Sequence, residues 1–460
     1  MKRVVLASLK DWVSQTHRKP ILVRGARQVG KSFLVQTLAD EVFETMVTIN
    51  FEQTPTLADL FESKQPRRII SLLETQFGQS IVPGKTLLFL DEIQAAPDVI
   101  ACLRYFYEQM PELHVIAAGS LLEFVLEDHD FSMPVGRIEY MHLGPMSFEE
   151  FLLALDKETL LSFLQKYSLS ESIPRPIHSD LMQHVKDYCF IGGMPEAVLK
   201  FATTGSYVQS EKTISSILST YADDFSKYGK RVNHQRILKV FSRVPKLVGQ
   251  KLKYTQIDRE EKSRDLKQAL HLLERARVVT LIQHSDANGI PLGAETNERF
   301  FKPLFLDVGL LCHACGLSMS NVQPSTPIML INSGAVCEQF VGQHLLYAGQ
   351  YYETPQSFCW ARQRGSSNAE VDYVISHGTE IIPIEVKAGK TGSLKSLHLF
   401  LSEKQRGFGL RFNADQPSVV DAITNVAGTP RHPFRLLSLP FYLIGQTKRL
   451  CHEARGWTSV

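Results

Sequence analysis

One stretch near the N-terminus constrains the fold more than any other part of the chain: Gly25-Ala26-Arg27-Gln28-Val29-Gly30-Lys31-Ser32. It satisfies the pattern G-x-x-x-x-G-K-[ST], and it lies between a short apolar run, 21–23, and a helix-like stretch, 32–38. The two glycines permit a tight turn whose backbone N–H groups face phosphate oxygens. Lys31 is then expected to reach the β- and γ-phosphates, and Ser32 to offer its hydroxyl to Mg²⁺. The stretch therefore predicts an α/β domain that binds a nucleoside triphosphate with Mg²⁺.

Two acidic residues end a second apolar run, and a small polar residue ends a third. Asp91 and Glu92 follow the run 86–90, as expected for a buried parallel strand with carboxylates at its C-terminal edge. In a phosphate-binding domain Asp91 would hold the Mg²⁺ shell, and Glu92 would orient the attacking water. Ser120 follows the strand-like run 114–119 and is placed to contact the γ-phosphate or that water.

With these motifs in place, residues 1–150 resemble the AAA+ superfamily of ATPases. The matching features are 25–32 as Walker A, 87–92 as Walker B and Ser120 as sensor 1. Arg137 stands just ahead of the expected fifth strand, where that superfamily often carries an arginine finger. The resemblance implies a homo-oligomer with nucleotide at its subunit interfaces. A surface arginine in a turn, or one in a loop ion pair, is the alternative for Arg137.

Basic residues concentrate in the middle of the chain. The segment 225–257 holds nine Lys or Arg residues and no acid, and 263–278 reads as a helix with one apolar and one basic face. Two strand-like runs follow, 278–282 and 299–306. Helix, helix and hairpin is the order of a winged helix, so we expect 229–325 to form one and to contact the DNA phosphate backbone. A solvated helix, or a winged helix that packs on other domains, is the alternative.

A second group of charged residues lies near the C-terminus. Asp372 begins one strand-like run, and Glu385 and Lys387 lie on the next, thirteen residues later. Residues i and i+2 of a strand face the same side, and a short hairpin can bring Asp372 beside them. Two carboxylates beside a lysine can hold Mg²⁺ or Mn²⁺, which can activate a water molecule for attack on a phosphodiester. An ion pair at the sheet edge between Lys387 and an acid is the alternative.

The segment 334–412 resembles the catalytic core of the PD-(D/E)XK nucleases. That resemblance implies that Glu338, on the helix before these strands, is a further metal ligand with Asp372 and Glu385. The whole arrangement is similar to a prokaryotic family of AAA+ ATPases whose C-terminal part is a poorly characterised domain of PD-(D/E)XK type. In that family a helical lid follows the ATPase domain.

The expected fold is therefore α/β throughout, in four parts: an AAA+-like ATPase domain at 1–150, a helical lid at 151–228, a winged helix at 229–325 and a PD-(D/E)XK-like domain at 326–460. No apolar run approaches the roughly 20 residues that span a bilayer, and the N-terminus lacks the features of a secretory signal. Seven cysteines, an odd number, do not indicate a disulfide framework. We therefore expect a cytoplasmic protein without a membrane partner.

Two functions fit these features. In the first, ATP turnover controls a C-terminal half that binds DNA, with or without metal-dependent cleavage. In the second, ATP drives assembly or partner binding, and an inactive nuclease-like domain only holds nucleic acid or protein. A third reading makes the winged helix and C-terminal domain protein-contact modules alone, and DNA binding that weakens steeply with salt would argue against it.

Overall fold

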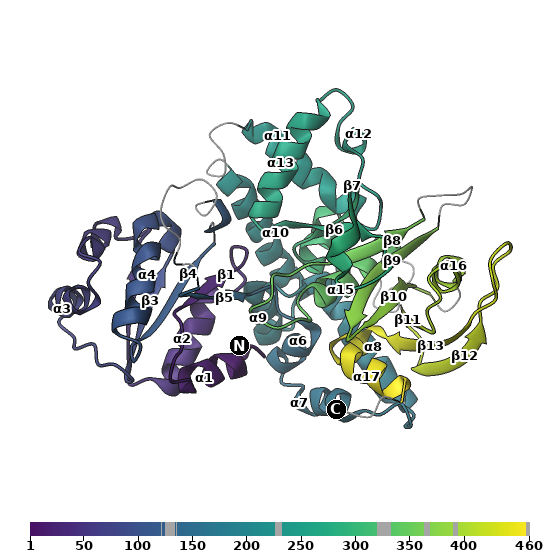
Figure 1. The fold of residues 1–460 in the computed structure, drawn as a ribbon, viewed down its shortest axis with the longest axis horizontal. Helices are drawn as coiled ribbons and strands as arrows, with labels where there is room; N and C mark the ends of the chain where they lie inside the picture. Colours follow the sequence, from purple (N-terminus) through teal and green to yellow (C-terminus); the bar gives the residue numbers. More distant parts are fainter. Residues whose placement is uncertain are drawn as a thin grey trace.

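Two β-sheets, one at each side of the molecule, organise the chain, and helices α9, α10 and α15 lie between them (Figure 1). The computed structural model describes every residue except 121, 125–133, 135, 226–231, 320–332, 363–368, 390–393 and 457–460. Within the described residues, no helix is long and apolar enough to cross a membrane.

The N-terminal sheet consists of five strands, all parallel, in the order β2-β3-β4-β1-β5. Its strands are β1 (Ile21–Arg24), β2 (Thr45–Asn50), β3 (Thr86–Asp91), β4 (His114–Gly119) and β5 (Glu139–His142). Its helices are α1 (Leu6–Ser14), α2 (Lys31–Val42), α3 (Pro66–Phe77) and α4 (Pro97–Gln109), with the 3-10 helices η1 (Pro55–Phe61) and η2 (Ile93–Ala95). The parallel α/β sheet predicted for this part of the chain is confirmed.

Successive residues of the central strands pack on opposite faces of this sheet, as the period of two requires. Leu87 and Phe89 of β3 join α1 and α2 in one core. Leu88 and Leu90 join α3 and α4 in another. Both faces are covered, so β3 is buried along its whole length, which explains its uninterrupted apolar sequence.

A group of helices follows the N-terminal sheet: α6 (Phe148–Ala154), α7 (Glu158–Lys166), α8 (Arg175–Ile191), α9 (Pro195–Thr204) and α10 (Tyr207–Asp224). Ser147 caps α6, because its side chain accepts from the Glu150 backbone N–H while the Glu150 carboxylate accepts from the Ser147 N–H. The glycine pair before α9 is held by Asp307, whose carboxylate accepts from Gly193 N–H at 2.7 Å.

The middle segment forms helices and a hairpin in the predicted order: α11 (His234–Arg243), η4 (Val244–Leu247), α12 (Tyr254–Ile257), α13 (Ser263–Arg275), β6 (Val279–Ser285), η5 (Leu292–Glu295) and β7 (Thr296–Phe305). Strands β6 and β7 are antiparallel, but β6 also pairs in parallel with β8. The hairpin is thereby part of the C-terminal sheet, whose strand order is β12-β13-β11-β10-β9-β8-β6-β7.

The remaining elements are α14 (Val308–Ala314), α15 (Ser333–Leu346), β8 (Phe358–Ala361), β9 (Glu370–His377), β10 (Glu380–Val386), α16 (Lys395–Glu403), β11 (Phe408–Asn413), β12 (Ser418–Ile423), β13 (Pro433–Pro440), η8 (Phe441–Gln446) and α17 (Thr447–Ala454). The sequence suggests strand-like pieces at 351–353 and 440–444. In the structure the first is a turn, and the second begins at the last residue of β13 and continues in η8. Short apolar or aromatic runs do not by themselves distinguish a strand from a buried turn.

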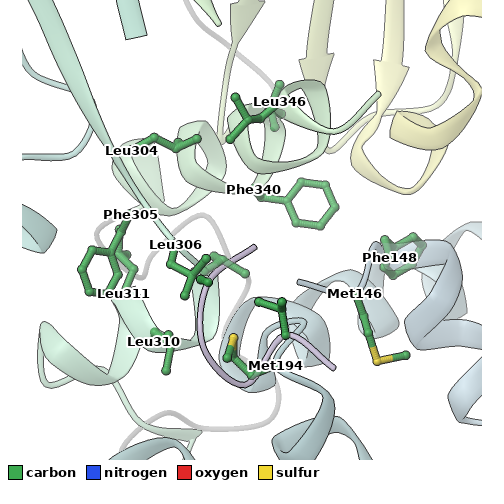
Figure 2. Close-up of a cluster of buried hydrophobic side chains, with 14 of the residues drawn as sticks. Met146, Phe148, Met194, Leu304, Phe305, Leu306, Leu310, Leu311, Phe340 and Leu346 are labelled. Carbon is green, nitrogen blue, oxygen red and sulfur yellow. The ribbon is translucent and has the colours of Figure 1, made fainter. Parts of the chain in front are cut away.

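One apolar core joins the parts of the chain. Met146 and Phe148, shortly after β5, Met194 before α9, and Phe340 on α15 belong to a single cluster with residues of β7 and α14 (Figure 2). Helix α15 is buried on most of its surface. It bonds to three neighbouring segments: Gln339 to the backbone of Phe305, Gln343 to Val308 N–H, and His344 to Phe148 N–H.

Candidate functional site

The phosphate loop has the backbone that its glycines predict. Gly30 caps α2 at φ 92°, a conformation that glycine adopts without strain. At Gly25 a Cβ atom would lie 2.3 Å from Leu143 O, so no side chain fits there. The Lys31 ammonium is buried and donates to Gly25 O at 3.1 Å and Ala26 O at 2.9 Å. Burial lowers the pKa of Lys31 to about 8, against the opposing effect of Glu92 and Asp91.

The acids predicted from the second apolar run lie at the same edge of the sheet. Ser32 Oγ donates to Asp91 Oδ2 at 2.9 Å, so a hydroxyl and a carboxylate converge where Mg²⁺ is expected. Burial raises the pKa of Asp91. Oxygen ligands of this kind suit Mg²⁺, and the glycine turn with a buried ammonium suits a polyphosphate. The residues present therefore fit the nucleotide and metal that the loop predicts.

Glu92 is oriented by two polar neighbours. Ser120 Oγ donates to Glu92 Oε2 at 3.4 Å, and Gln94 Nε2 donates to the same oxygen at 2.5 Å. Glu92 itself has φ 50°, an uncommon conformation for a residue other than glycine, which turns it away from the strand direction. A Cβ on Gly119 would lie 2.1 Å from the Gln94 side chain, so this glycine makes room for Gln94. Sequence reasoning assigned no role to Gln94, although it follows Glu92 by only two residues.

The loop is also held from outside the ATPase sheet. Arg3 Nη1 donates to Val29 O at 2.9 Å, and Tyr221 OH, on α10, donates to Arg27 O at 2.6 Å. The Arg27 guanidinium pairs with Asp224, the last residue of α10. Helix α10 therefore contacts the loop directly, through residues far away in the sequence.

Arg137 lies away from the loop of its own chain. It precedes β5, whose Glu139 pairs with Ile21 at the start of β1, whereas the loop follows the end of β1. Its Nε donates to Glu108 Oε1 at 2.9 Å, and its guanidinium carbon lies 5.9 Å from the Tyr107 ring centroid. The side chain is 44% exposed, so it is accessible to a neighbouring molecule.

A bridge of charges connects the ATPase domain to the base of α13. Glu123, shortly after Ser120, pairs with Arg24 at the end of β1 and with Arg277 before β6. Arg275 Nη2 adds bonds to Glu123 O at 3.1 Å and Phe124 O at 3.2 Å. Burial alone would raise the pKa of Glu123, but Arg277 and Arg24 outweigh it and lower the pKa. No pattern in the sequence indicates this bridge, because its members are separated by about one hundred residues or more.

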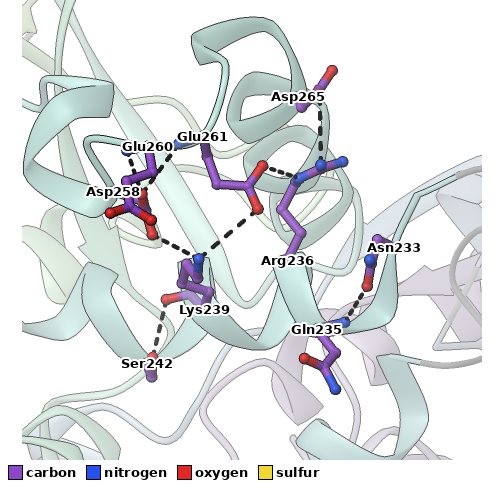
Figure 3. Close-up of polar contacts among 9 residues, drawn as sticks. All are labelled: Asn233, Gln235, Arg236, Lys239, Ser242, Asp258, Glu260, Glu261 and Asp265. Atoms are coloured by element: carbon purple, nitrogen blue, oxygen red, sulfur yellow. Dashed lines mark hydrogen bonds and ion pairs between the residues drawn. The ribbon is translucent and has the colours of Figure 1, made fainter.

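The basic stretch divides into two parts in the structure. Arg236 and Lys239 face acids that follow the stretch in sequence (Figure 3). Arg236 pairs with Glu261 at 2.9 Å and with Asp265 at 3.4 Å, and Lys239 with Asp258 at 2.6 Å. These two charges are locally neutralised. Lys227, Lys230 and Arg231 lie outside the described residues.

Two other residues of the stretch, Arg243 and Lys246, line a pocket together with Arg259, which follows the stretch. Arg243, Lys246 and Arg259 are exposed around a cavity of about 440 Å³ that also includes Gln250 and Gln256. The described residues that line this pocket include no carboxylate. On α13, the predicted apolar positions Leu266, Leu270 and Leu273 are buried, and Arg264, Lys267 and His271 are exposed.

The C-terminal charged residues converge as their spacing predicts. Val386 N–H donates to Asp372 Oδ2 at 2.8 Å, and Lys387 Nζ lies 2.5 Å from Glu385 Oε1. Burial and the nearby Asp372 raise the pKa of Glu385 to about 7. Glu338 of α15 lies in the same cluster, and burial raises its pKa to about 8.

Two further residues of this cluster were not assigned from the sequence. Glu370 precedes Asp372 by two residues and so shares its side of β9. Lys302, from β7, has its ammonium 2.9 Å from Glu370 Oε1, 3.2 Å from Glu338 Oε2 and 3.7 Å from Asp372 Oδ1. Phe300 and Leu304, two residues before and after Lys302 on the same face of β7, are apolar and buried, which is the one sequence signal that the lysine points inward.

A parallel α/β sheet with a phosphate loop, a Ser–Asp pair and a second acid defines a P-loop ATPase domain. Residues 17–152 match the family model of an AAA domain, so this domain is of the AAA type. Two models of domains of unknown function also match: DUF8612 at 182–321 and DUF4143 at 333–427. No curated protein matches the chain.

Solved structures resemble the chain only distantly. The Walker-type ATPase PABY2304 of Pyrococcus abyssi is 15% identical, with 67% of this chain and 94% of that chain covered and a TM-score of 0.43. The Aeropyrum pernix ORC2 protein, in ADPNP–ADP complexes, is 12% identical, with 68% and 93% covered and a TM-score of 0.35. The STAND protein PH0952 of Pyrococcus horikoshii is 11% identical, with 73% and 44% covered and a TM-score of 0.24.

Proposed function

We propose that this protein is an ATP-hydrolysing enzyme that couples nucleotide turnover to DNA binding by its middle and C-terminal parts. The observation that carries the proposal is the bridge from Arg24 through Glu123 to Arg277. It joins the strand that leads into the phosphate loop, the segment after Ser120, and the base of the basic helix α13. A rearrangement around the γ-phosphate would therefore be transmitted to the DNA-binding face.

Bound ATP with Mg²⁺ supplies the phosphoryl group that is transferred to water. Lys31, now bonded to two loop carbonyls, exchanges them for phosphate oxygens, where its charge is better compensated. Ser32 and Asp91 hold the metal. Glu92 orients the attacking water, and Ser120 and Gln94 hold the Glu92 carboxylate in place.

Assembly is part of the proposal. Arg137 is exposed and lies at the opposite edge of the sheet from the loop, so it would act as an arginine finger only in the site of a neighbouring copy. The alternative is that Arg137 only forms a surface ion pair, which its bond to Glu108 would equally well represent.

Replacement of the Glu123 carboxylate by an amide tests the role of the bridge. Glu123→Gln keeps the shape but leaves Arg24 and Arg277 without their shared counter-charge, so the unfolding free energy should fall by about 2 kcal/mol or more. ATP should change the DNA affinity of the wild type by about 5- to 150-fold, the usual range of coupling between sites. In Glu123→Gln that ratio should approach one while ATP still binds. Fluorescence anisotropy of labelled DNA with and without ATP measures it.

The pH dependence of the unfolding free energy distinguishes the bridge from other contacts. Because the pKa of Glu123 is lowered in the folded protein, its stabilisation is present above its unfolded pKa of about 4.3 and is lost as pH falls through the folded value. The stability difference between wild type and Glu123→Gln should shrink over that range. The control is Glu44→Gln, which removes an exposed pair with Lys85. Unchanged coupling in Glu123→Gln would contradict the role of the bridge.

The basic pocket is the second element that supports DNA binding. Three cations around one concave surface without a carboxylate among its described residues suit a phosphate backbone. Arg236 and Lys239 are each paired with an acid and so are not available to DNA phosphates. The positive charge that is available for DNA therefore lies near α12 and η4 rather than along the whole stretch.

The double variant Arg243→Ala/Lys246→Ala should weaken binding of unrelated DNA sequences by similar factors. The slope of log affinity against log salt should fall by about 0.9 for each DNA phosphate that the variant no longer neutralises. Lys166→Ala, which removes an exposed lysine of α7, is the control and should leave the slope unchanged. If the double variant keeps the wild-type affinity and slope, DNA does not bind at this pocket, and a protein-contact role gains support.

Metal-dependent nucleic-acid cleavage is a second candidate activity. The observation that favours it is the convergence of Asp372, Glu385 and Lys387 on neighbouring strands β9 and β10. If DNA binds as proposed above, DNA is the polymer that would be cut. Lys302 within the same cluster opposes this candidate.

A further inference from the structure

The C-terminal acid cluster contains its own cation. Four carboxylates meet there: Glu338 from α15, Glu370 and Asp372 from β9, and Glu385 from β10. The Lys302 ammonium lies among the first three, at 2.9 to 3.7 Å from one oxygen of each. This lysine comes from β7, the last strand of the sheet, and so from the β6–β7 hairpin rather than from the elements that carry the four acids.

Lys302 is deeply buried. Its side chain is 1% exposed, and its ammonium lies 5.8 Å from the Tyr373 ring centroid. A buried ammonium is stable only where opposite charges and hydrogen bonds replace its water shell. The three carboxylates provide that compensation. Since they lie on α15 and β9, the contact also fastens β7 to both elements.

The same geometry leaves no place for a divalent ion. Mg²⁺ needs several oxygen ligands at about 2.0–2.1 Å in a nearly octahedral arrangement. Here the oxygens of Glu338, Glu370 and Asp372 that point inward face the ammonium. An ion set between them would lie against a like charge within a few ångströms.

Two of the remaining oxygens of the cluster have partners of their own. Asp372 Oδ2 accepts from Val386 N–H, and Glu385 Oε1 faces Lys387. Within the described part of the cluster, Glu385 Oε2 is buried without a hydrogen-bond partner, and a single oxygen does not make a Mg²⁺ site. Among the described residues, no group of three or more His, Cys, Asp or Glu side chains is arranged to hold a metal ion.

We propose that Lys302 is the resident cation of this cluster: it takes the position of a divalent metal ion, holds β7 against β9 and α15, and prevents metal-dependent cleavage while it remains there. The proposal concerns the C-terminal cluster alone. It stands whether or not ATP turnover controls DNA binding, so its failure and that of the proposed function are distinguishable.

Mn²⁺ binding to the full-length, nucleotide-free chain tests the proposal, with the electron paramagnetic resonance signal of free Mn²⁺ as the readout. The proteins compared are wild type, Asp372→Asn, Lys302→Met and Lys302→Met/Asp372→Asn. Methionine nearly preserves the length of lysine and removes its charge. Lys267→Met, on the exposed face of α13, is the matched control.

Wild type, Asp372→Asn and the Lys267 control should show the same Mn²⁺ binding. Lys302→Met should gain a site that disappears in the double variant, and Mn²⁺ should raise its unfolding temperature, because the metal replaces the missing charge. Wild-type binding that Asp372→Asn removes would overturn the proposal. A folded Lys302→Met protein that gains no Mn²⁺ site would overturn it as well. Should Lys302→Met fail to fold, the comparison of wild type with Asp372→Asn decides between the two outcomes.

Discussion

ATP hydrolysis by the Lys31→Ala variant should fall by about 100- to 1,000-fold or more, the loss typical when a preorganised charge at a reacting group is removed. The ammonium of Lys31 is the buried positive charge of the phosphate loop, and it donates to Gly25 O and Ala26 O. Alanine has no ammonium group, so it can neither bind the phosphate oxygens nor balance the negative charge of the phosphates. Release of inorganic phosphate measures the turnover, and calorimetric titration measures the weaker nucleotide binding.

The fold of Lys31→Ala must be checked separately. The variant removes the lysine donor from two loop carbonyls, at about 1 kcal/mol for each hydrogen bond removed. Thermal unfolding should therefore shift modestly and stay cooperative. Lys85→Ala, at an exposed position of the same domain, is the control for the removal of a positive charge. Wild-type turnover in the Lys31 variant would show that hydrolysis occurs at another site.

Glu92→Gln should separate binding from hydrolysis. The amide keeps the shape of the side chain but cannot accept a proton from the attacking water, so turnover should fall by about 100- to 10,000-fold. The hydrogen bonds of Lys31 in the phosphate loop do not involve Glu92, and the Ser32–Asp91 pair is unchanged, so ATP affinity should stay within the wild-type range. Single-turnover phosphate release and nucleotide titration measure the two quantities.

Two companion variants sharpen this result. Gln94→Ala should lower turnover less than Glu92→Gln, because Gln94 positions the Glu92 carboxylate and takes no part in proton transfer. Glu112→Gln, at an acid before β4, should have no effect. Equal rates for wild type and Glu92→Gln would mean that another residue orients the water.

The ATPase site was largely predictable because its elements are local. A glycine loop between a strand and a helix, and acids at the end of an apolar strand, each carry their geometry within a few residues. Parallel strands then bring these ends to one edge, where Ser32 meets Asp91. The cluster of Asp372, Glu385 and Lys387 was predictable for the same reason, since it depends on one hairpin and a period of two.

Charge compensation was not predictable in the same way. The basic stretch reads as a single feature, but Arg236 and Lys239 are paired with acids of the next segment, and only part of the stretch surrounds the open pocket. The partner of a long side chain is decided by which segments the fold brings within a few ångströms. Sequence distance contains little of that information.

By itself the sequence determined the kind of ATPase domain, the positions of Lys31, Ser32, Asp91 and Glu92, and the pairing of strands β9 and β10, because short-range backbone geometry specifies all of these. Only the tertiary structure decided that Glu123 connects the ATPase sheet to α13, and that Lys302 lies inside the C-terminal acid cluster. Both facts depend on contacts between segments that lie far apart in the chain, and buried charges are stable only where such contacts compensate them.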